Sequence, residues 1–229
     1  MAVARCSHDV TRMPTPRSIS DPRKVNKLVN VEVCPGSGPK KGSTHHGNDV
    51  VCIGTRAIVT LFDGLAVVDV SDPANAKTVA SMTSLGVGTF VQSRGEQGEV
   101  HRMGRLLLTP DGRYALVSGL HGVAVIDLAD VDNPVLVKTV VTGEDPNKKT
   151  LCLQGQMMLL DGWAYVVNGH RDGFGVSCID MRNPANPVKV GAHALADGNL
   201  IPLGAEHLLV TGHRRTDMTI VQVNVANFG

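Results

Sequence analysis

Apolar and polar positions alternate in short runs along most of the chain, and no stretch requires a helix. Four stretches each contain two apolar runs separated by a short turn: VVCIGTRAIVTL (50–61), LLLTPDGRYALVSG (106–119), MMLLDGWAYVVNG (157–169) and LIPLGAEHLLVTG (200–212). Every turn contains a glycine, which readily adopts the positive φ of a tight turn between two strands. The pattern therefore predicts four β-hairpins.

A second pair of apolar runs follows each hairpin, which makes the pattern an internal repeat. Its copies read GLAVVDVSDPANAKTVA (64–80), GVAVIDLADVDNPVLVKTV (122–140), GFGVSCIDMRNPANPVKV (173–190) and, more weakly, MTIVQVNVANFG (218–229). An Asp or Asn recurs in them at positions 69, 127, 180 and 224. The spacing exceeds that of a leucine-rich repeat and suits the four-stranded blade of a β-propeller. We therefore predict an all-β fold with four such blades.

The N-terminal stretch ISDPRKVNKLVNVEV (19–33) repeats the second half of the unit. It predicts an outer strand at about 23–33 that completes the last blade, so that the sheet has no open edge there. On this interpretation residues 1–17 are a flexible lead-in and residues 18–229 are one propeller domain. The alternative is that the chain is part of a longer propeller.

The repeat resembles the LVIVD-type β-propeller repeat family, whose unit reads approximately GLxIIDISDPxNPxxVG. The stretches that carry the resemblance are AYVVNG (164–169), GLAVVDVSDP (64–73) and NPANPVKVG (183–191). The resemblance covers residues 18–228 and implies a propeller. The last unit departs from the family pattern, because Pro202 interrupts its first strand and Phe228 replaces the turn proline.

Composition narrows the classes of partner. The formal net charge is +1 and aromatic residues make up 3% of the 229 residues, which argues against nucleic acid as a partner. No apolar stretch has the length of a membrane-spanning helix, which argues against direct membrane insertion. The five cysteines are widely spread and contain no CxxC pair, which favours a reducing intracellular compartment. The basic first 30 residues would indicate an organelle if they are the remnant of a transit sequence.

In a propeller, the loops between second and third strands share one face with the connections between blades. This rule gathers most of the histidines on one face, together with charged loop residues. The partner-binding or ligand-binding candidates on that face are His101, His121, His170, Arg171, Asp172, His213, Arg214 and Phe90. Phe90 belongs to SLGVGTFVQSRGEQGE (84–99), the longest connection between blades, and long connections are often functional.

Two functions are compatible with this face. A set of imidazoles from His46, His101, His170 and His213 could hold iron, copper or zinc, as in a His-liganded oxidase or oxygenase. The third repeat, however, carries Gln154 where an equivalent ring of ligands needs a histidine. We therefore favour a non-catalytic, cofactor-free scaffold or accessory subunit that binds a protein partner. Capture of a small molecule at the axis is a third hypothesis.

Overall fold

The computed structural model describes the following residues: 31, 49–61, 64–87, 90–93, 99–102, 105–119, 122–142, 156–170, 173–194, 200–203, 207–211 and 218–222. Within these ranges the chain forms seventeen β-strands and no helix, which confirms the all-β prediction. The predicted N-terminal strand at 23–33 and the lead-in lie outside the described residues, apart from Val31.

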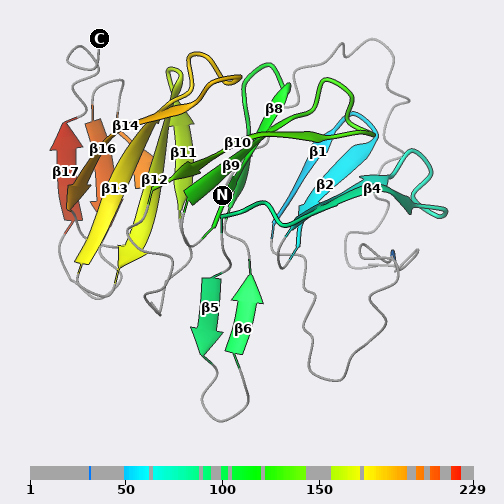
Figure 1. Ribbon diagram of the computed structural model, residues 1–229, viewed down its shortest axis with the longest axis horizontal. Helices are drawn as coiled ribbons and strands as arrows, with labels where there is room; N and C mark the ends of the chain where they lie inside the picture. The colour runs from blue at the N-terminus through cyan, green and yellow to red at the C-terminus, as the bar shows by residue number, and fades with distance from the viewer. Residues whose placement is uncertain are drawn as a thin grey trace, which may run out of the picture.

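Four antiparallel sheets follow one another along the chain (Figure 1). The first sheet contains β1 (Val50–Ile53), β2 (Arg56–Thr60), β3 (Gly64–Asp69) and β4 (Lys77–Thr83). The second contains β7 (Leu106–Leu108), β8 (Tyr114–Ser118), β9 (Gly122–Asp127) and β10 (Val135–Val141). The third contains β11 (Met157–Leu160), β12 (Trp163–His170), β13 (Gly173–Asp180) and β14 (Val188–Ala194). The fourth contains β15 (Leu200–Pro202), β16 (His207–Thr211) and β17 (Met218–Gln222).

The strands within each sheet lie in chain order, so that neighbours pair as simple hairpins. In the first three sheets the predicted turns join the first and second strands, and Gly162 shows why glycine is needed there, with φ at +80°. A separate hairpin, β5 (Phe90–Ser93) with β6 (Glu99–Arg102), lies within the connection between the first and second sheets. This connection is the one that the sequence marks as the longest.

The register shifts in strand pairing also repeat from sheet to sheet. In the first three sheets the pairing between third and fourth strands shifts by one residue at the same place, which leaves Val79, Val137 and Val190 without a ladder partner. In the first and second sheets, the third strand begins close to the fourth. A Cβ on Gly64 would lie 2.0 Å from the Met82 carbonyl oxygen, and one on Gly122 would lie 2.1 Å from that of Val140. Only glycine fits this approach.

The sheets pack face to face and bury one apolar cluster at each of the three junctions between neighbours. The first strands lie next to one another in the order β1, β7, β11 and β15. This is a propeller-like arrangement, and its described sheets form an open arc with the first and fourth sheets at opposite ends (Figure 1). The number of blades in a complete ring stays a prediction.

The register corrects one detail of the repeat. Asp180 lies opposite Trp163 in the third sheet, and the matching pair in the fourth sheet is Gln222 opposite His207. The repeated carboxylate position is therefore occupied by Gln222, not by Asn224 as the sequence comparison predicts. Asn224 itself lies outside the described residues.

Candidate functional site

The histidine-rich face predicted from the sequence is described only in part. Phe90 is the first residue of β5, His101 lies in β6, and His170 is the last residue of β12, opposite Gly173. The other predicted site residues lie outside the described residues: His46, His121, Arg171, Asp172, His213 and Arg214. The proposed ligand set for a metal therefore stays a prediction.

Two hairpins project on the same side of the arc, which we call the loop face. It carries the β5–β6 hairpin and the tip of the β12–β13 hairpin, where His170 lies (Figure 1). The β12–β13 ladder contains eight residue pairs, whereas β8–β9 contains five, so this hairpin reaches further than its counterpart in the second sheet. The roles of His101 and His170 as binding residues stay predictions.

A polar position that the sequence reasoning missed lies where the first strands begin. Asp49, Arg105 and Gln156 are equivalent, because the carbonyl of each accepts a hydrogen bond from the last part of the second strand. Asp49 Oδ2 accepts a bond from the backbone N–H of Leu106 at 3.1 Å and lies 3.8 Å from Arg105 Nη1. The signal that could have found it is the polar residue just before each apolar first strand.

The opposite end of the arc carries the repeated carboxylates, and we call it the anchored face. Asp69, Asp127 and Asp180 each end a third strand and accept the backbone N–H two residues later, at 2.9, 2.8 and 2.9 Å. This bond closes a turn at the side-chain oxygen, as Asp and Asn often do. At these three positions the repeated Asp therefore has a structural role.

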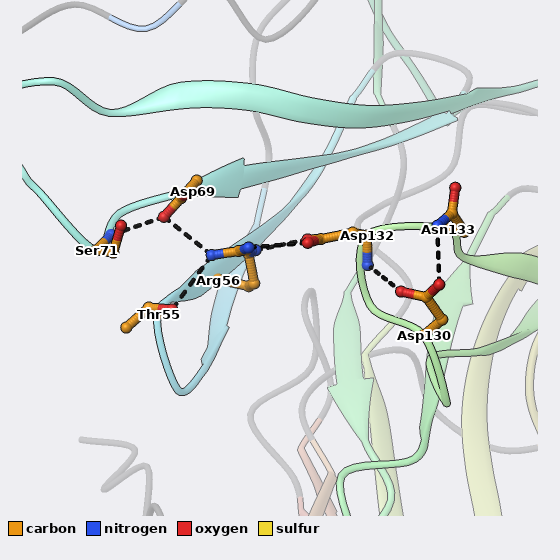
Figure 2. A network of polar contacts seen from close by, with 7 residues as sticks. All are labelled: Thr55, Arg56, Asp69, Ser71, Asp130, Asp132 and Asn133. Atoms are coloured by element: carbon orange, nitrogen blue, oxygen red, sulfur yellow. Dashed lines mark hydrogen bonds and ion pairs between the residues drawn. The ribbon is translucent and has the colours of Figure 1, made fainter.

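An arginine pairs with each of these carboxylates, but from a different place in each sheet. Arg56 Nη1 lies 2.9 Å from Asp69, Arg113 Nη2 lies 3.2 Å from Asp127, and Arg182 Nη2 lies 2.6 Å from Asp180. Among the three, Arg56 also bonds the neighbouring sheet, where its Nε and Nη2 donate to Asp132 at 2.5 and 2.8 Å (Figure 2).

In the first two sheets a second turn follows the repeated carboxylate. In the second sheet this turn fixes the position of Asp132. Asp130 accepts the backbone N–H of Asp132 at 3.1 Å and the side-chain amide of Asn133 at 2.8 Å (Figure 2). In the first sheet Asp72 accepts from Ala74 and Asn75 in the same way, at 3.0 and 2.7 Å. The turn therefore holds the Asp132 carboxylate in position for Arg56.

These contacts keep the carboxylates ionised. Hydrogen bonds from Arg56 and from Arg182 lower the pKa of Asp132 and of Asp180, respectively. For Asp69, the pKa is lowered first by hydrogen bonds from Ser71 and then by the charge of Arg56. A general acid near neutral pH needs a raised pKa. The anchored carboxylates are shifted the opposite way, as groups with a structural role are.

A thiol in the third sheet is held unreactive. Cys178 is 8% exposed, and burial raises the pKa of its thiol to about 11. Because the thiolate is the nucleophile, a thiol with this pKa is a poor one at neutral pH. Cys52 in the first sheet is exposed. Within the described ranges, no three His, Cys, Asp or Glu residues are placed to hold a metal ion.

In the part of the chain that the structure describes, no helix is long and apolar enough to cross a membrane.

Comparison with known proteins supports the fold and leaves the family open. No family model matches the chain, and no curated protein matches it. A solved structure of a protein from Lactobacillus plantarum aligns with a TM-score of 0.59 and 12% identity, over 81% of this chain and 53% of that chain.

Two further solved structures align less closely. A putative 6-phosphogluconolactonase from Bacteroides fragilis aligns with a TM-score of 0.46 and 14% identity, over 77% of this chain and 66% of that one. A periplasmic gluconolactonase from Pseudomonas aeruginosa aligns with a TM-score of 0.45 and 12% identity, over 77% and 66%. The chain thus spans between half and two thirds of the length of these proteins, and the likeness concerns the fold alone.

Proposed function

We propose that this protein is a non-catalytic, propeller-like scaffold or accessory subunit that binds a protein partner through the loop face. The observation that carries the proposal is a structural difference between the two ends of the arc. At the anchored face, the charged groups of the repeat are paired with one another and with backbone N–H groups. At the loop face, two hairpins project from the sheets (Figure 1).

The binding surface consists of the β5–β6 hairpin and the extended tip of β12–β13. Projecting hairpins on a rigid sheet framework suit recognition, because their backbone is already ordered when the partner binds. Phe90 and His101 on one hairpin and His170 on the other are the predicted contacts, with His121, Arg171, Asp172, His213 and Arg214 from the adjoining loops. The extra length of β12–β13 extends its tip beyond the position of the matching β8–β9 tip.

The family and the blade number are part of the same proposal. We assign the chain to the LVIVD-type repeat family, with four blades. Within the described residues, β17 pairs only with β16, whereas the third strands of the other sheets pair on both sides. The segment 23–33 would supply this missing outer strand. Deletion of residues 1–17 should then leave the melting temperature unchanged, whereas deletion of 1–33 should lower it.

The test of partner binding is to shorten the β12–β13 hairpin. Residues 168–175 are replaced by the sequence at 119–122, which closes the matching hairpin of the second sheet. Val188→Ser, on the exposed surface of β14, is the control. Tagged versions of all three proteins are used to isolate complexes from cells, and bound proteins are identified by cross-linking and mass spectrometry.

We expect a stoichiometric partner that is kept by the control and lost by the shortened hairpin, with unchanged melting temperature in both variants. A partner that the shortened protein retains would contradict the assignment to the loop face. Elemental analysis by ICP-MS decides between the scaffold and a metalloenzyme. One iron, copper or zinc per chain, lost on substitution of His46 or His170, would replace the scaffold proposal by the oxidase or oxygenase hypothesis.

A further inference from the structure

The β5–β6 hairpin has no third strand beside it. Among the described strands, β5 and β6 form a sheet of their own with four residue pairs, and the hairpin projects from the arc (Figure 1). A hairpin of two strands is at best marginally stable in water when it stands alone. The order of this hairpin must therefore depend on what holds its two ends together.

The chain enters the hairpin from a segment that is buried between the first and second sheets. Leu85 and Val87 are 0% exposed, although they follow β4 and belong to no strand. Both lie in the apolar cluster where the back face of the first sheet, at Ile58, packs against the front face of the second, at Val117. Ser84, just before them, has a φ of +62°, which is uncommon for a residue other than glycine. Burial of the two side chains offsets the cost of this conformation.

A hydrogen bond ties the same segment to the outer strand of the second sheet. Thr139 Oγ1, on β10, donates to the carbonyl oxygen of Leu85 at 2.7 Å. The second and third sheets are tied in a similar way, because Lys189 Nζ, on β14, donates to the carbonyl oxygen of Thr142 at 3.0 Å. In both cases the carbonyl follows one outer strand and the donor lies on the next. Thr139 therefore fixes the entry to the hairpin from across the junction.

The chain leaves the hairpin at a second anchor, which also joins the two sheets. The backbone N–H of Arg105 donates to Ser118 Oγ at 2.8 Å, and the carbonyl of Arg105 accepts the N–H of Ser118 at 3.0 Å. The next residue, Leu106, donates its N–H to Asp49 Oδ2, just before the first strand of the first sheet. The exit is thus held by the second sheet and by the first.

Both anchors lie close to the hairpin along the chain. Phe90 is the third residue after Val87, and Arg105 is the third after Arg102, so each end of the hairpin lies within about 11 Å of an anchor. Each anchor has one partner in the first sheet and one in the second. We propose that the hairpin is ordered only while these two sheets stay packed together, with Thr139 as the residue that positions its entry.

This coupling links the loop face to the interior of the arc. Packing of the first sheet against the second holds the two ends of the hairpin together, and separation of the sheets releases both ends. By the same coupling, a contact that fixes the hairpin stabilises the junction between the sheets. The coupling is a property of the free chain and does not require a partner on the loop face.

The experiment measures backbone amide hydrogen exchange of the full chain without any partner. Thr139→Val removes the donor but keeps the branched shape, whereas Thr139→Ser keeps the hydroxyl and is the matched control. We expect exchange across 90–93 and 99–102 to be about two- to tenfold faster in Thr139→Val, which corresponds to the loss of one hydrogen bond. Thr139→Ser should exchange as the wild type does. The β12–β13 ladder should be unchanged in both variants.

A second pair of variants tests the junction itself. Ile58→Val and Ile179→Val remove the same group from side chains that are both 0% exposed. Ile58 lies in the cluster between the first and second sheets, whereas Ile179 lies in the cluster between the second and third. Both variants should lower the melting temperature by similar amounts. Only Ile58→Val should speed exchange across the β5–β6 hairpin.

Four results would overturn the proposal. The first is a hairpin that exchanges in the wild type as fast as an unfolded peptide. The second is wild-type exchange of the hairpin in Thr139→Val, and the third is equally faster exchange in all sheets of that variant, because the loss would then be general. The fourth is equal exchange of the hairpin in Ile58→Val and Ile179→Val. Failure to isolate a partner of the loop face would leave all these rates unaffected, so the two proposals fail separately.

Discussion

The first three sheets each place an arginine next to the repeated carboxylate, but they do so with different residues. The position opposite the repeated carboxylate is Arg56 in the first sheet, Tyr114 in the second and Trp163 in the third. The two aromatic rings are covered by an arginine of their own sheet, with Arg113 at 5.2 Å from the centroid of Tyr114 and Arg182 at 4.6 Å from that of Trp163.

This difference determines which carboxylates each arginine contacts. Arg113 and Arg182 lie over a ring and pair with the carboxylate of the same sheet, so they stabilise that sheet. Arg56 extends from the strand itself and bridges Asp69 to Asp132 of the next sheet. The repeat therefore preserves a carboxylate and a cation at one place in space, while the residue that supplies the cation changes.

The largest expected effect is on the aromatic version of the anchor. Trp163 is 1% exposed and lies in the cluster between the third and fourth sheets. Trp163→Ala should lower the free energy of unfolding by about 3–5 kcal/mol, because it leaves a cavity and removes the surface beneath Arg182. Urea denaturation measures the loss. Trp163→Phe, which keeps a ring, should lose much less, and equal losses would contradict a packing role for the ring.

The next effect concerns a feature that the first two sheets share. Gly122→Ala should cost about 1–3 kcal/mol of unfolding free energy, because the new Cβ meets the Val140 carbonyl and forces the outer strand away. Gly64→Ala should behave alike. Gly112→Ala is the control, since its φ is positive but no atom lies within 4 Å of the added Cβ, and a loss of about 1 kcal/mol is expected there. A larger loss of unfolding free energy for Gly112→Ala than for Gly122→Ala would show that positive φ, not contact with the outer strand, is the stronger reason for glycine.

A smaller effect separates the bridging arginine from the stacked one. Arg56→Met should lower the melting temperature more than Arg113→Met, because it leaves two facing carboxylates without their common partner. Asp132→Asn added to each variant completes the comparison. We expect the loss from Asp132→Asn to shrink in the Arg56→Met background and to stay unchanged in the Arg113→Met background. Equal coupling in both would contradict the bridge between sheets.

The smallest effect is the dependence of stability on pH. Hydrogen bonds and arginine charges hold the pKa of Asp132 and Asp180 below the unfolded value of about 3.9. A carboxylate with a lowered pKa stabilises the fold fully above that unfolded value, and this contribution is lost as the pH falls through the folded pKa. Stability should therefore be level from about pH 7 to pH 5 and fall below about pH 4. Arg56→Met should fall less steeply in acid, and an unchanged slope would argue against Arg56 as the partner of Asp132.

Local pattern predicted most of the fold. The four hairpins, the glycine turns of the first three and the Asp at 69, 127 and 180 lie where the sequence places them, because strand period and turn chemistry depend on neighbouring residues. The structural role of that Asp was also predictable, since the bond that it accepts comes from the residue two positions later. The assignment to position 224 was wrong, because the likeness of VNVANF to VDVSDP does not report which third-strand residue lies opposite the start of the second strand.

The candidate site was less predictable. The grouping of Phe90, His101 and His170 with the other loop residues stays a prediction of the propeller rule. The β5–β6 hairpin and the added length of β12–β13 do not follow from hydrophobic pattern. Neither does the pairing of Asp49 with Arg105, which depends on the first two sheets lying side by side. The remaining predicted residues of the loop face await a direct experiment.

The sequence by itself determined the strands, the turns and the fact that they repeat, since each depends on contacts within a few residues. Only the tertiary structure decided which cation meets which carboxylate. Arg56 and Asp132 are separated by 76 residues, and they meet because the first and second sheets pack back to front. The same packing decided that Leu85 and Val87 are buried although they belong to no strand. Burial depends on which sheet lies alongside, and no local pattern contains that information.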